Sequence, residues 1–272
     1  TFSYSLYQVA RRIKGSMVDN HFHLGLKVDP ISKFGAFQYQ PGNPTNRILG
    51  GIDEAGRGAV IGPMVVAGVS FREKDMRELE RIGVRDSKEL SRKGRASIYG
   101  QVVGIARSIC ICVVQTTEID DHVSFNRLNH LEALAMAQVI DNMKADNIFV
   151  DCCDVNQEKF KAHILSYLKR RLRIRRGKLD IFSFHHADSL HLAVSAASIV
   201  AKVIREEELG NIKRIHQGIG SGYPSDKKTV SFIKSWIDEV GAPPPFVRSS
   251  WLPVKRLLSE RQQRQLLLSQ GS

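Results

Sequence analysis

One stretch near the start of the chain limits the possible folds more than any other. The strand predicted over residues 48–53 begins as an apolar run and closes on Asp53, the first of two adjacent carboxylates, Asp53 and Glu54. A glycine-rich turn separates this strand from a second apolar run over residues 64–71. Successive side chains of an extended chain point to opposite faces, so both carboxylates can line one surface only if the strand ends between them. The glycines predict that it ends there. We therefore expect a strand, a turn and a second strand.

Further along the chain, short apolar runs alternate with segments of helical spacing. Strands are predicted over residues 108–115, 147–151 and 179–185. Helices are predicted over residues 73–82, 91–103, 128–142, 158–173, 192–209, 227–239 and 251–268. Strands that alternate with helices favour a layered α/β domain, and the last two helices predict a helical C-terminal region.

The composition favours a globular protein with an anionic partner. Forty Lys and Arg against 28 Asp and Glu give a net charge of +12, which is typical of nucleic-acid binding, although the charge alone does not separate nucleic acid from an acidic membrane surface. No run approaches the roughly 20 apolar residues that span a bilayer, so we expect a soluble, cytoplasmic protein without membrane association. The four cysteines lie in apolar runs without C-x-x-C spacing, which predicts free buried thiols.

Four acids stand at the ends of predicted strands or directly after them. They are Asp53, Glu54, Asp151 and Asp188. Carboxylates are the ligands that Mg²⁺ or Mn²⁺ selects, and several of them together are costly unless a cation neutralises their charge. Any one of them alone is better explained as a solvated turn residue. Four at one sheet edge of a basic protein predict a site for two metal ions, of the kind that hydrolyses phosphodiesters.

The glycine turn admits a competing interpretation as a dinucleotide-binding fingerprint. Gly56, Gly58 and Gly62 give G-x-G-x-x-x-G, one residue longer than the G-x-G-x-x-G pattern, and the segment that follows is β-branched rather than helical. This argues against a nucleotide-dependent oxidoreductase. A glycine-rich loop with Arg57 at its tip can still bring backbone N–H groups against a phosphate or a ribose.

Two other polar clusters in the sequence each allow more than one role. Residues 169–176 are the densest basic run, and this run is either the solvated end of a helix or a contact to a duplex backbone. His185, His186 and His191 lack the spacing of known metal motifs, which favours a structural role or mere proximity to the site.

These motifs, in this order, resemble the type 2 ribonucleases H, in particular the archaeal and eukaryotic branch. The residues that carry the resemblance are Gly51–Gly58 with Ile61–Pro63, Arg85–Leu90, Asn129–Ala133 with Ala135–Ala137, Val150-Asp151, His186–Asp188, Ser195–Val203 and Gly220–Asp226. The resemblance covers residues 48–251. It implies a ribonuclease H-like fold, with a mixed central sheet flanked by helices.

The resemblance also implies roles for single residues. Asp53, Glu54, Asp151 and Asp188 match the family's metal-binding catalytic acids. Gly56, Arg57 and Gly58 match the segment that inspects the ribose 2′-hydroxyl, and Tyr223 matches a tyrosine that stacks on the neighbouring deoxyribose. Lys88 and Lys202 match lysines that face a phosphate or lie next to the site.

The sequence thus predicts a metal-dependent endoribonuclease. We expect it to hydrolyse the RNA strand of RNA–DNA hybrids and to cut 5′ to a single ribonucleotide in duplex DNA, leaving a 3′-hydroxyl and a 5′-phosphate. We expect residues 47–252 to form the catalytic domain, residues 253–272 a basic terminal helix, and residues 1–46 an extension of unknown role, with the chain acting as a monomer. The alternative from another class is a non-catalytic protein that binds RNA–DNA hybrids.

Overall fold

The structure is a computed structural model that describes residues 5–9, 46–84, 90–172 and 180–270 of the 272-residue chain. The chain forms two compact units. The first, the sheet unit, comprises Thr1–Ala55, Val65–Val113 and Asn129–Ile204, and the second, the helical unit, comprises Gly56–Met64, Val114–Leu128 and Arg205–Ser272.

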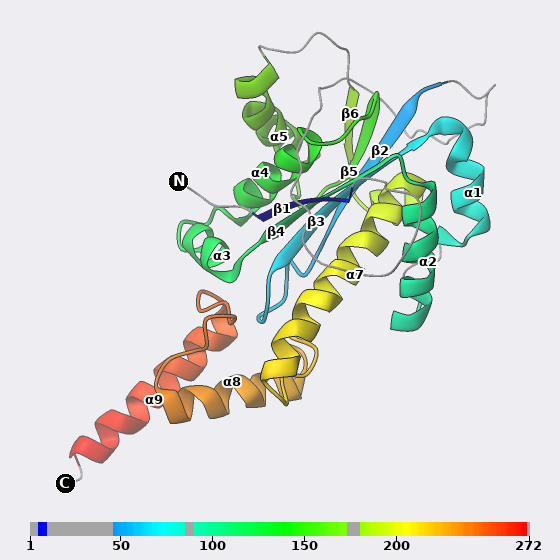
Figure 1. Ribbon diagram of the computed structural model, residues 1–272. Coiled ribbons are helices and arrows are strands. Elements are labelled where there is room, and N and C mark those ends of the chain that lie inside the picture. Colours follow the sequence, from blue (N-terminus) through cyan, green and yellow to red (C-terminus); the bar gives the residue numbers. More distant parts are fainter. Residues whose placement is uncertain (1–4, 10–45, 85–89, 173–179, 271–272) are drawn as a thin grey trace. The chain divides into compact units, whose positions relative to one another are not determined.

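Within the described ranges, six strands form one mixed sheet in the order β1-β4-β3-β2-β5-β6 (Figure 1). They are β1 (Ser5–Val9), β2 (Ile48–Ala55), β3 (Met64–Arg72), β4 (Ser108–Val114), β5 (Asn147–Asp151) and β6 (Asp180–Phe184). β2 is antiparallel to β3 and parallel to β5, and β5 is parallel to β6. The mixed sheet expected from the sequence is confirmed. β1, which pairs antiparallel with β4, was not predicted.

Helices cover both faces of the sheet (Figure 1). On one face, alternate residues of β3 and β4 pack against α1 (Met76–Arg81), α2 (Arg92–Ile105) and the first turns of α7 (Leu192–Ile215). On the other face, Cys110 of β4 donates a hydrogen bond of 2.8 Å to the carbonyl of Asn142, just after α4 (Leu128–Ile140). Residues that alternate along a strand thus enter two different cores, as the pleat of a strand requires.

Two further helices of the sheet unit follow β5 and β6 in the chain. α5 (Gln157–Leu172) contributes the buried residues Phe160, Ile164 and Leu168, and the short helix α6 (Ala187–Leu190) follows β6. Ser91 caps α2, because its hydroxyl accepts a hydrogen bond from the N–H of Gly94 at 3.2 Å.

The helical unit has a core of its own. It contains α3 (Thr116–Val123), α8 (Lys227–Val240), α9 (Leu252–Gln270) and the glycine turn. The buried apolar residues of this core are Val60, Ile61, Leu209, Ile219, Ile233, Ile237, Val247 and Val254. α3 was not predicted, although Gln115 and Glu118 form a capping box at its start.

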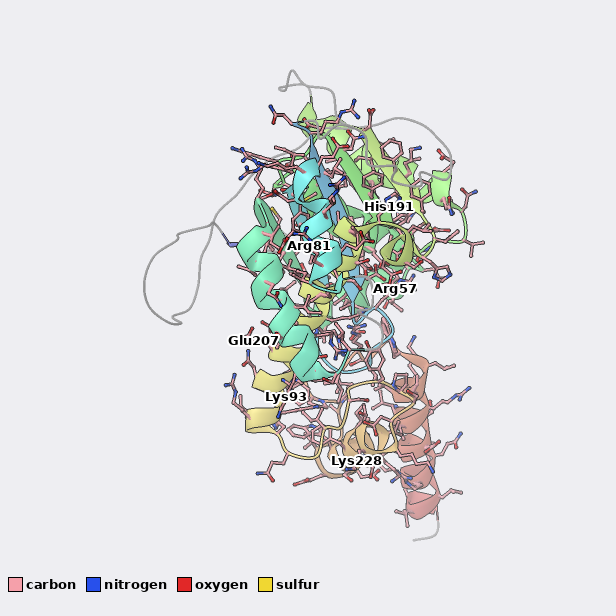
Figure 2. The ribbon with its side chains drawn as sticks, turned by 90° about the vertical axis from the view of Figure 1, so that its right-hand side faces the viewer. Arg57, Arg81, Lys93, His191, Glu207 and Lys228 are labelled. Carbon is pink, nitrogen blue, oxygen red and sulfur yellow. The ribbon has the colours of Figure 1, made fainter. Side chains whose placement is uncertain are left out.

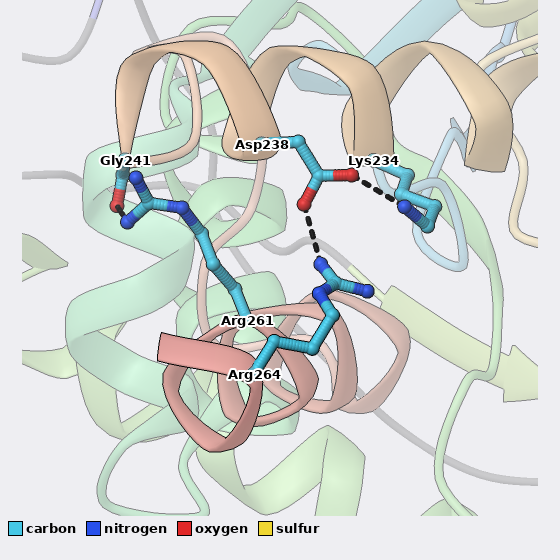
Figure 3. A network of polar contacts seen from close by, with 5 residues as sticks. All are labelled: Lys234, Asp238, Gly241, Arg261 and Arg264. Carbon is cyan, nitrogen blue, oxygen red and sulfur yellow. Dashed lines mark hydrogen bonds and ion pairs between the residues drawn. The ribbon is translucent and has the colours of Figure 1, made fainter. Parts of the chain in front are cut away.

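Polar contacts join α8 and α9 along their exposed sides (Figure 3). Asp238 of α8 accepts hydrogen bonds from Lys234 and, at 2.5 Å, from Arg264 of α9. Arg261 of α9 donates to the carbonyl of Gly241, which follows the end of α8, at 3.4 Å. Cations near the C-terminal end of a helix complement its dipole, so these contacts stabilise the packing of the two helices.

The cysteines are free thiols, as the sequence predicts. Cys110, Cys112 and Cys152 are buried, Cys153 is half-buried, and burial raises the pKa of the Cys110 thiol to about 12. No helix in the described part of the chain combines the length and the apolar character needed to cross a bilayer.

Candidate active site

The strand that carries Asp53 and Glu54 continues past both residues. β2 stays paired with β3 as far as Ala55, which lies opposite Val65. The prediction that the strand ends between the two acids is therefore wrong, because β3 is long enough to hold β2 in the ladder for two more residues. The turn begins only at Gly56, with φ +84°. In a continuous strand, Asp53 and Glu54 point to opposite faces of the sheet.

Asp53 lies on the face that α7 covers, and its side chain is 5% exposed. Burial raises the pKa of this carboxyl to about 7; a hydrogen bond from Ser198 opposes the shift, and the charge of Asp151 adds to it. Lys202, one turn further along α7, donates to the Ser198 hydroxyl at 2.8 Å. The carboxyl also accepts a hydrogen bond of 2.7 Å from the N–H of Glu54. A buried carboxyl with a raised pKa is a common mark of a functional site.

The close approach of α7 to this strand depends on glycine. A Cβ atom on Gly51 of β2 would lie 2.0 Å from the carbonyl carbon of Ala193 in α7, which is an impossible distance. Only glycine lets the helix backbone come this near. The same helix carries Ser198 and Lys202, so this contact helps to place both residues on the face of Asp53.

Asp151 is the last residue of β5, the strand next to β2. The parallel register pairs Ile52 with Val150, and Asp53 and Asp151 follow one residue later on the two strands. Asp151 accepts a hydrogen bond of 2.8 Å from the N–H of Ala187, the first residue of α6. Asp188 is the next residue of α6 and is buried. The structure thus brings Asp53, Asp151 and the start of α6 together at one sheet edge.

The four acids do not enclose a metal site as their side chains stand. Within the part of the chain that the structure describes, no three His, Cys, Asp or Glu side chains are grouped so that they could hold a metal ion together. Their chemistry nevertheless suits a hard cation. Carboxylate oxygens are the ligands of Mg²⁺ and Mn²⁺, and a cation would replace the proton that Asp53 retains near neutral pH.

The glycine turn and the Tyr223 loop lie together in the helical unit. The N–H groups of Val60 and Ile61 donate to the carbonyl of Gly222 at 2.8 and 3.1 Å. Arg57, labelled in Figure 2, is half-buried, and Tyr223 is 37% exposed. The turn is followed by β3, which runs antiparallel to β2, rather than by a helix. This excludes the dinucleotide-binding arrangement, in which a helix must follow the glycines.

Two arginines at this turn were missed by the sequence interpretation. The buried Arg248 donates hydrogen bonds to carbonyls of the turn, and the guanidinium of Arg205 lies 4.8 Å from the centroid of the Tyr223 ring. Neither belongs to a recognisable motif. The available signal was weak: Arg248 is a single cation between the apolar Val247 and the aromatic Trp251.

The other residues singled out in the sequence are a histidine, a lysine and the basic run. His191, labelled in Figure 2, stacks on the ring of Phe149 with centroids 4.1 Å apart, and burial lowers its pKa to about 4. A neutral stacked ring agrees with the structural role favoured for it. Lys88 lies outside the described residues, and so do the side chains of the run 169–176.

Comparison with known proteins identifies the family. The family model for ribonuclease HII matches residues 50–254 of the chain. The chain belongs to the ribonuclease HII family. The ribonuclease HII of Cenarchaeum symbiosum (strain A) is 43% identical over 205 residues, which cover 75% of this chain and 95% of that protein.

Two solved structures support the same assignment. The crystal structure of ribonuclease H2 from Pyrococcus horikoshii OT3 matches with a TM-score of 0.71 and 33% identity, covering 79% of this chain and 99% of the other. The ribonuclease HII in a PCNA complex from Archaeoglobus fulgidus matches with a TM-score of 0.68 and 34% identity, covering 77% and 96%. The ribonuclease H-like fold predicted from the sequence is confirmed.

Membership of the family establishes the class of reaction. The chain is an endonuclease of the ribonuclease H class, and members of this family act on RNA–DNA hybrids. The alternative of a non-catalytic hybrid-binding protein is thereby set aside. The basic net charge of +12 agrees with a polyanionic substrate.

Proposed function

We propose that this ribonuclease HII cuts on the 5′ side of a single ribonucleotide embedded in duplex DNA, as well as within RNA–DNA hybrids. The products would carry a 3′-hydroxyl and a 5′-phosphate. The observation that carries the proposal is the buried Asp53 carboxyl, which lies beside the strand of Asp151 and has a pKa raised to about 7. Holding such a carboxyl out of water costs stability, which favours a functional reason for keeping it.

The residues that would hold divalent metal ions are Asp53, Asp151 and Asp188, together with Glu54, whose carboxylate would have to reach the ions from the opposite face of β2. The ions would be Mg²⁺ or Mn²⁺. A pair of such ions supplies an activated water and neutralises charge on the leaving oxygen of a phosphodiester. Ser198 would hold Asp53 in one orientation through its hydroxyl, and Lys202 would fix that hydroxyl and add positive charge. For Lys88, which lies outside the described residues, the expectation from the resemblance stands as it was: it faces a phosphate of the substrate or lies next to the site.

The sugar would be recognised by the glycine turn and by Tyr223. The 2′-hydroxyl is the group that distinguishes a ribonucleotide from a deoxyribonucleotide, so its recognition has to lie beside the cleaved phosphate. Backbone groups of residues 56–58 can approach a ribose closely because Gly58 is exposed and has no atom within 4 Å of the position of a Cβ. The exposed part of the Tyr223 ring can stack on the neighbouring deoxyribose.

Two matched duplexes test this proposal. One is DNA with a single ribonucleotide, the other has a continuous RNA strand, and each is incubated with the purified chain and Mg²⁺, Mn²⁺ or EDTA. We expect both to be cut with either metal and neither with EDTA. Cleavage of the continuous hybrid alone would refute the single-ribonucleotide specificity. Cleavage by the isolated chain would also support the expected single-subunit state.

Replacement of Tyr223 by Ala should impair the single-ribonucleotide substrate more than the continuous hybrid. The duplex with one ribonucleotide offers a single deoxyribose for stacking at the junction, and loss of a stacked ring costs about 1–3 kcal/mol, or roughly 10- to 100-fold in rate. Tyr223→Phe keeps the ring and serves as the control, with nearly wild-type rates. Single-turnover cleavage of both duplexes gives the comparison, and equal losses on both would contradict the junction role.

The raised pKa of Asp53 predicts how the metal-free protein responds to pH. The folded state keeps the Asp53 proton up to about pH 7, whereas an unfolded Asp releases it near its ordinary value of 3.8. Stability should therefore fall as pH rises from about 4 through 7, by roughly 2–4 kcal/mol. Asp53→Asn, which resembles the protonated form, should show a smaller fall. Urea unfolding with EDTA at pH 5 and pH 8 measures this.

Binding of Mg²⁺ should restore the stability that the metal-free protein loses as pH rises. Mg²⁺ at pH 8 should raise the unfolding midpoint of the wild-type protein, because a ligand that binds the folded state alone stabilises it. Asp53→Asn should respond much less. An equal Mg²⁺ effect on both proteins would contradict the assignment of Asp53 as a metal ligand.

A further inference from the structure

A charged side chain is buried within the helical unit. Arg248 is fully buried and is the largest of the fully buried side chains in the described part of the chain. Burying a guanidinium is expensive unless its donors are satisfied. Among the described residues, no carboxylate lies within salt-bridge distance of it. Its partners are backbone carbonyls and the ring of Trp251, whose centroid lies 5.0 Å from the guanidinium carbon.

All of the carbonyls that Arg248 binds belong to the glycine turn. Its Nη2 donates to Gly56 O at 2.7 Å and to Gly62 O at 2.9 Å, Nη1 donates to Arg57 O at 2.8 Å, and Nε donates to Gly62 O at 3.1 Å. The planar guanidinium has five N–H donors in a fixed arrangement, so one side chain can hold three carbonyls in a defined geometry.

The fixed carbonyls determine where the neighbouring N–H groups point. In a planar trans peptide, the C=O and the N–H point in opposite directions. Because Gly56 O and Arg57 O point to Arg248, the N–H groups of Arg57 and Gly58 point away from it. A pair of successive N–H groups directed outward from a turn is a suitable site for an oxygen atom of a ligand.

A second arginine supports the same turn from beside Gly56. A Cβ on Gly56 would lie 2.1 Å from Nε of Arg205, so the Arg205 side chain packs directly on the Gly56 backbone. Its Nη2 donates to Ile61 O at 3.4 Å, and its guanidinium carbon lies 4.8 Å from the centroid of the Tyr223 ring. Burial lowers the pKa of both arginines, and the charge of Arg205 adds to the effect on Arg248. The turn and Tyr223 therefore share a buried cationic support.

We infer that Arg248 is a positioning residue for ribose recognition: by holding the carbonyls of Gly56, Arg57 and Gly62, it directs the N–H groups of Arg57 and Gly58 toward the 2′-hydroxyl. This inference rests on the proposed function. Arg248 itself is buried and touches no substrate, so its effect passes through the backbone of the turn. Loss of the planar Arg248 guanidinium should impair selection of the ribonucleotide more than it impairs overall binding of the duplex.

Arg248→Lys tests this inference in the full chain. A lysine keeps the charge but replaces the planar guanidinium by a single ammonium group, so one side chain can no longer donate hydrogen bonds to all three carbonyls in the same geometry. We expect kcat on the single-ribonucleotide duplex to fall about 10- to 100-fold. KM should change by less than about 3-fold, because phosphate contacts dominate duplex affinity. The continuous hybrid, which offers a 2′-hydroxyl at every position, should lose much less activity.

Arg261→Lys is the matched control. Arg261 also donates to the carbonyl of a loop glycine in the helical unit, Gly241 at 3.4 Å, but this glycine is outside the recognition turn (Figure 3). We expect its ratio of single-ribonucleotide to hybrid cleavage to match that of the wild type. If Arg248→Lys fails to fold, Trp251→Leu, which removes the ring beside the guanidinium, should lower the same ratio to a smaller degree.

The outcomes separate this inference from the proposed function. If the wild-type protein does not cut the single-ribonucleotide duplex, the proposed function fails. If the wild-type protein cuts it and a folded Arg248→Lys (or, failing that, a folded Trp251→Leu) keeps the wild-type ratio of the two rates, the positioning role of Arg248 is overturned. An equal loss on both substrates would likewise overturn it, because that is the result of a merely structural role.

Discussion

Replacement of Asp53 by Asn should lower the rate of hybrid cleavage by about 10³-fold or more. The carboxylate is buried beside Asp151, and its negative charge is what a divalent cation would need at this position. Asn keeps the size and can still accept a hydrogen bond, but it carries no charge. A loss of several kcal/mol of metal-dependent transition-state stabilisation corresponds to this factor. Single-turnover cleavage with saturating enzyme measures the chemical step directly.

Binding of the hybrid by Asp53→Asn should remain within a few fold of wild type, because phosphate contacts by basic residues supply most of the affinity. Asp154→Asn is a suitable control. Asp154 follows the same strand, β5, but its carboxylate accepts a hydrogen bond from Asn129 at 2.8 Å and is not one of the four acids. We expect this variant to keep a nearly normal rate. Unchanged turnover in Asp53→Asn would refute the metal assignment.

Replacement of Gly51 by Ala should destabilise the fold severely. The new Cβ would lie 2.0 Å from a backbone carbon of Ala193 and 2.1 Å from its carbonyl oxygen, so α7 would have to move away from β2. The backbone of a helix cannot move aside as the end of a flexible side chain can. We expect a loss of about 3 kcal/mol or more in the free energy of unfolding. Urea denaturation of the purified variant measures the loss, and failure to accumulate as folded protein would agree with it.

Gly100→Ala is the matched control, because the same substitution should have the opposite effect on the stability of the fold at this position. Gly100 lies inside α2, and a Cβ there would meet no atom within 4 Å. Alanine favours the helix over glycine by about 1 kcal/mol, so this variant should be slightly more stable than wild type. If Gly51→Ala were as stable as Gly100→Ala, the close contact between α7 and β2 would be contradicted.

Much of the fold could be predicted from the periodicity of the sequence. Apolar runs of strand length and helical stripes determined five strands and the long helices, because burial imposes periods of two and 3.6 residues. The short helices carry no such signal. α6 has four residues, too few to show a period, and it forms where Asp151 accepts the N–H of Ala187. Such an element depends on a tertiary contact that no local pattern records.

The candidate site could be predicted only in part, for two physical reasons. The acids stand at strand ends, which local sequence reveals, but the length of β3 determines where β2 ends, and this is a matter of strand pairing. Hence the prediction that the side chains of Asp53 and Glu54 line one surface was wrong. Arg248 was missed because its partners are the carbonyls of residues 186 or more positions earlier, and a carbonyl leaves no trace in the side-chain sequence.

The most direct test of the account is to map the cut in duplex DNA that contains one ribonucleotide. The strand is labelled at either end, incubated with the purified chain and Mg²⁺ or Mn²⁺, and its product ends are identified. We predict one cut on the 5′ side of the ribonucleotide, with a 3′-hydroxyl upstream and a 5′-phosphate on the ribonucleotide. An uncut strand would contradict the proposal. So would a cut on the 3′ side that leaves a 2′,3′-cyclic phosphate, because the 2′-hydroxyl would then be the nucleophile rather than the group that is recognised.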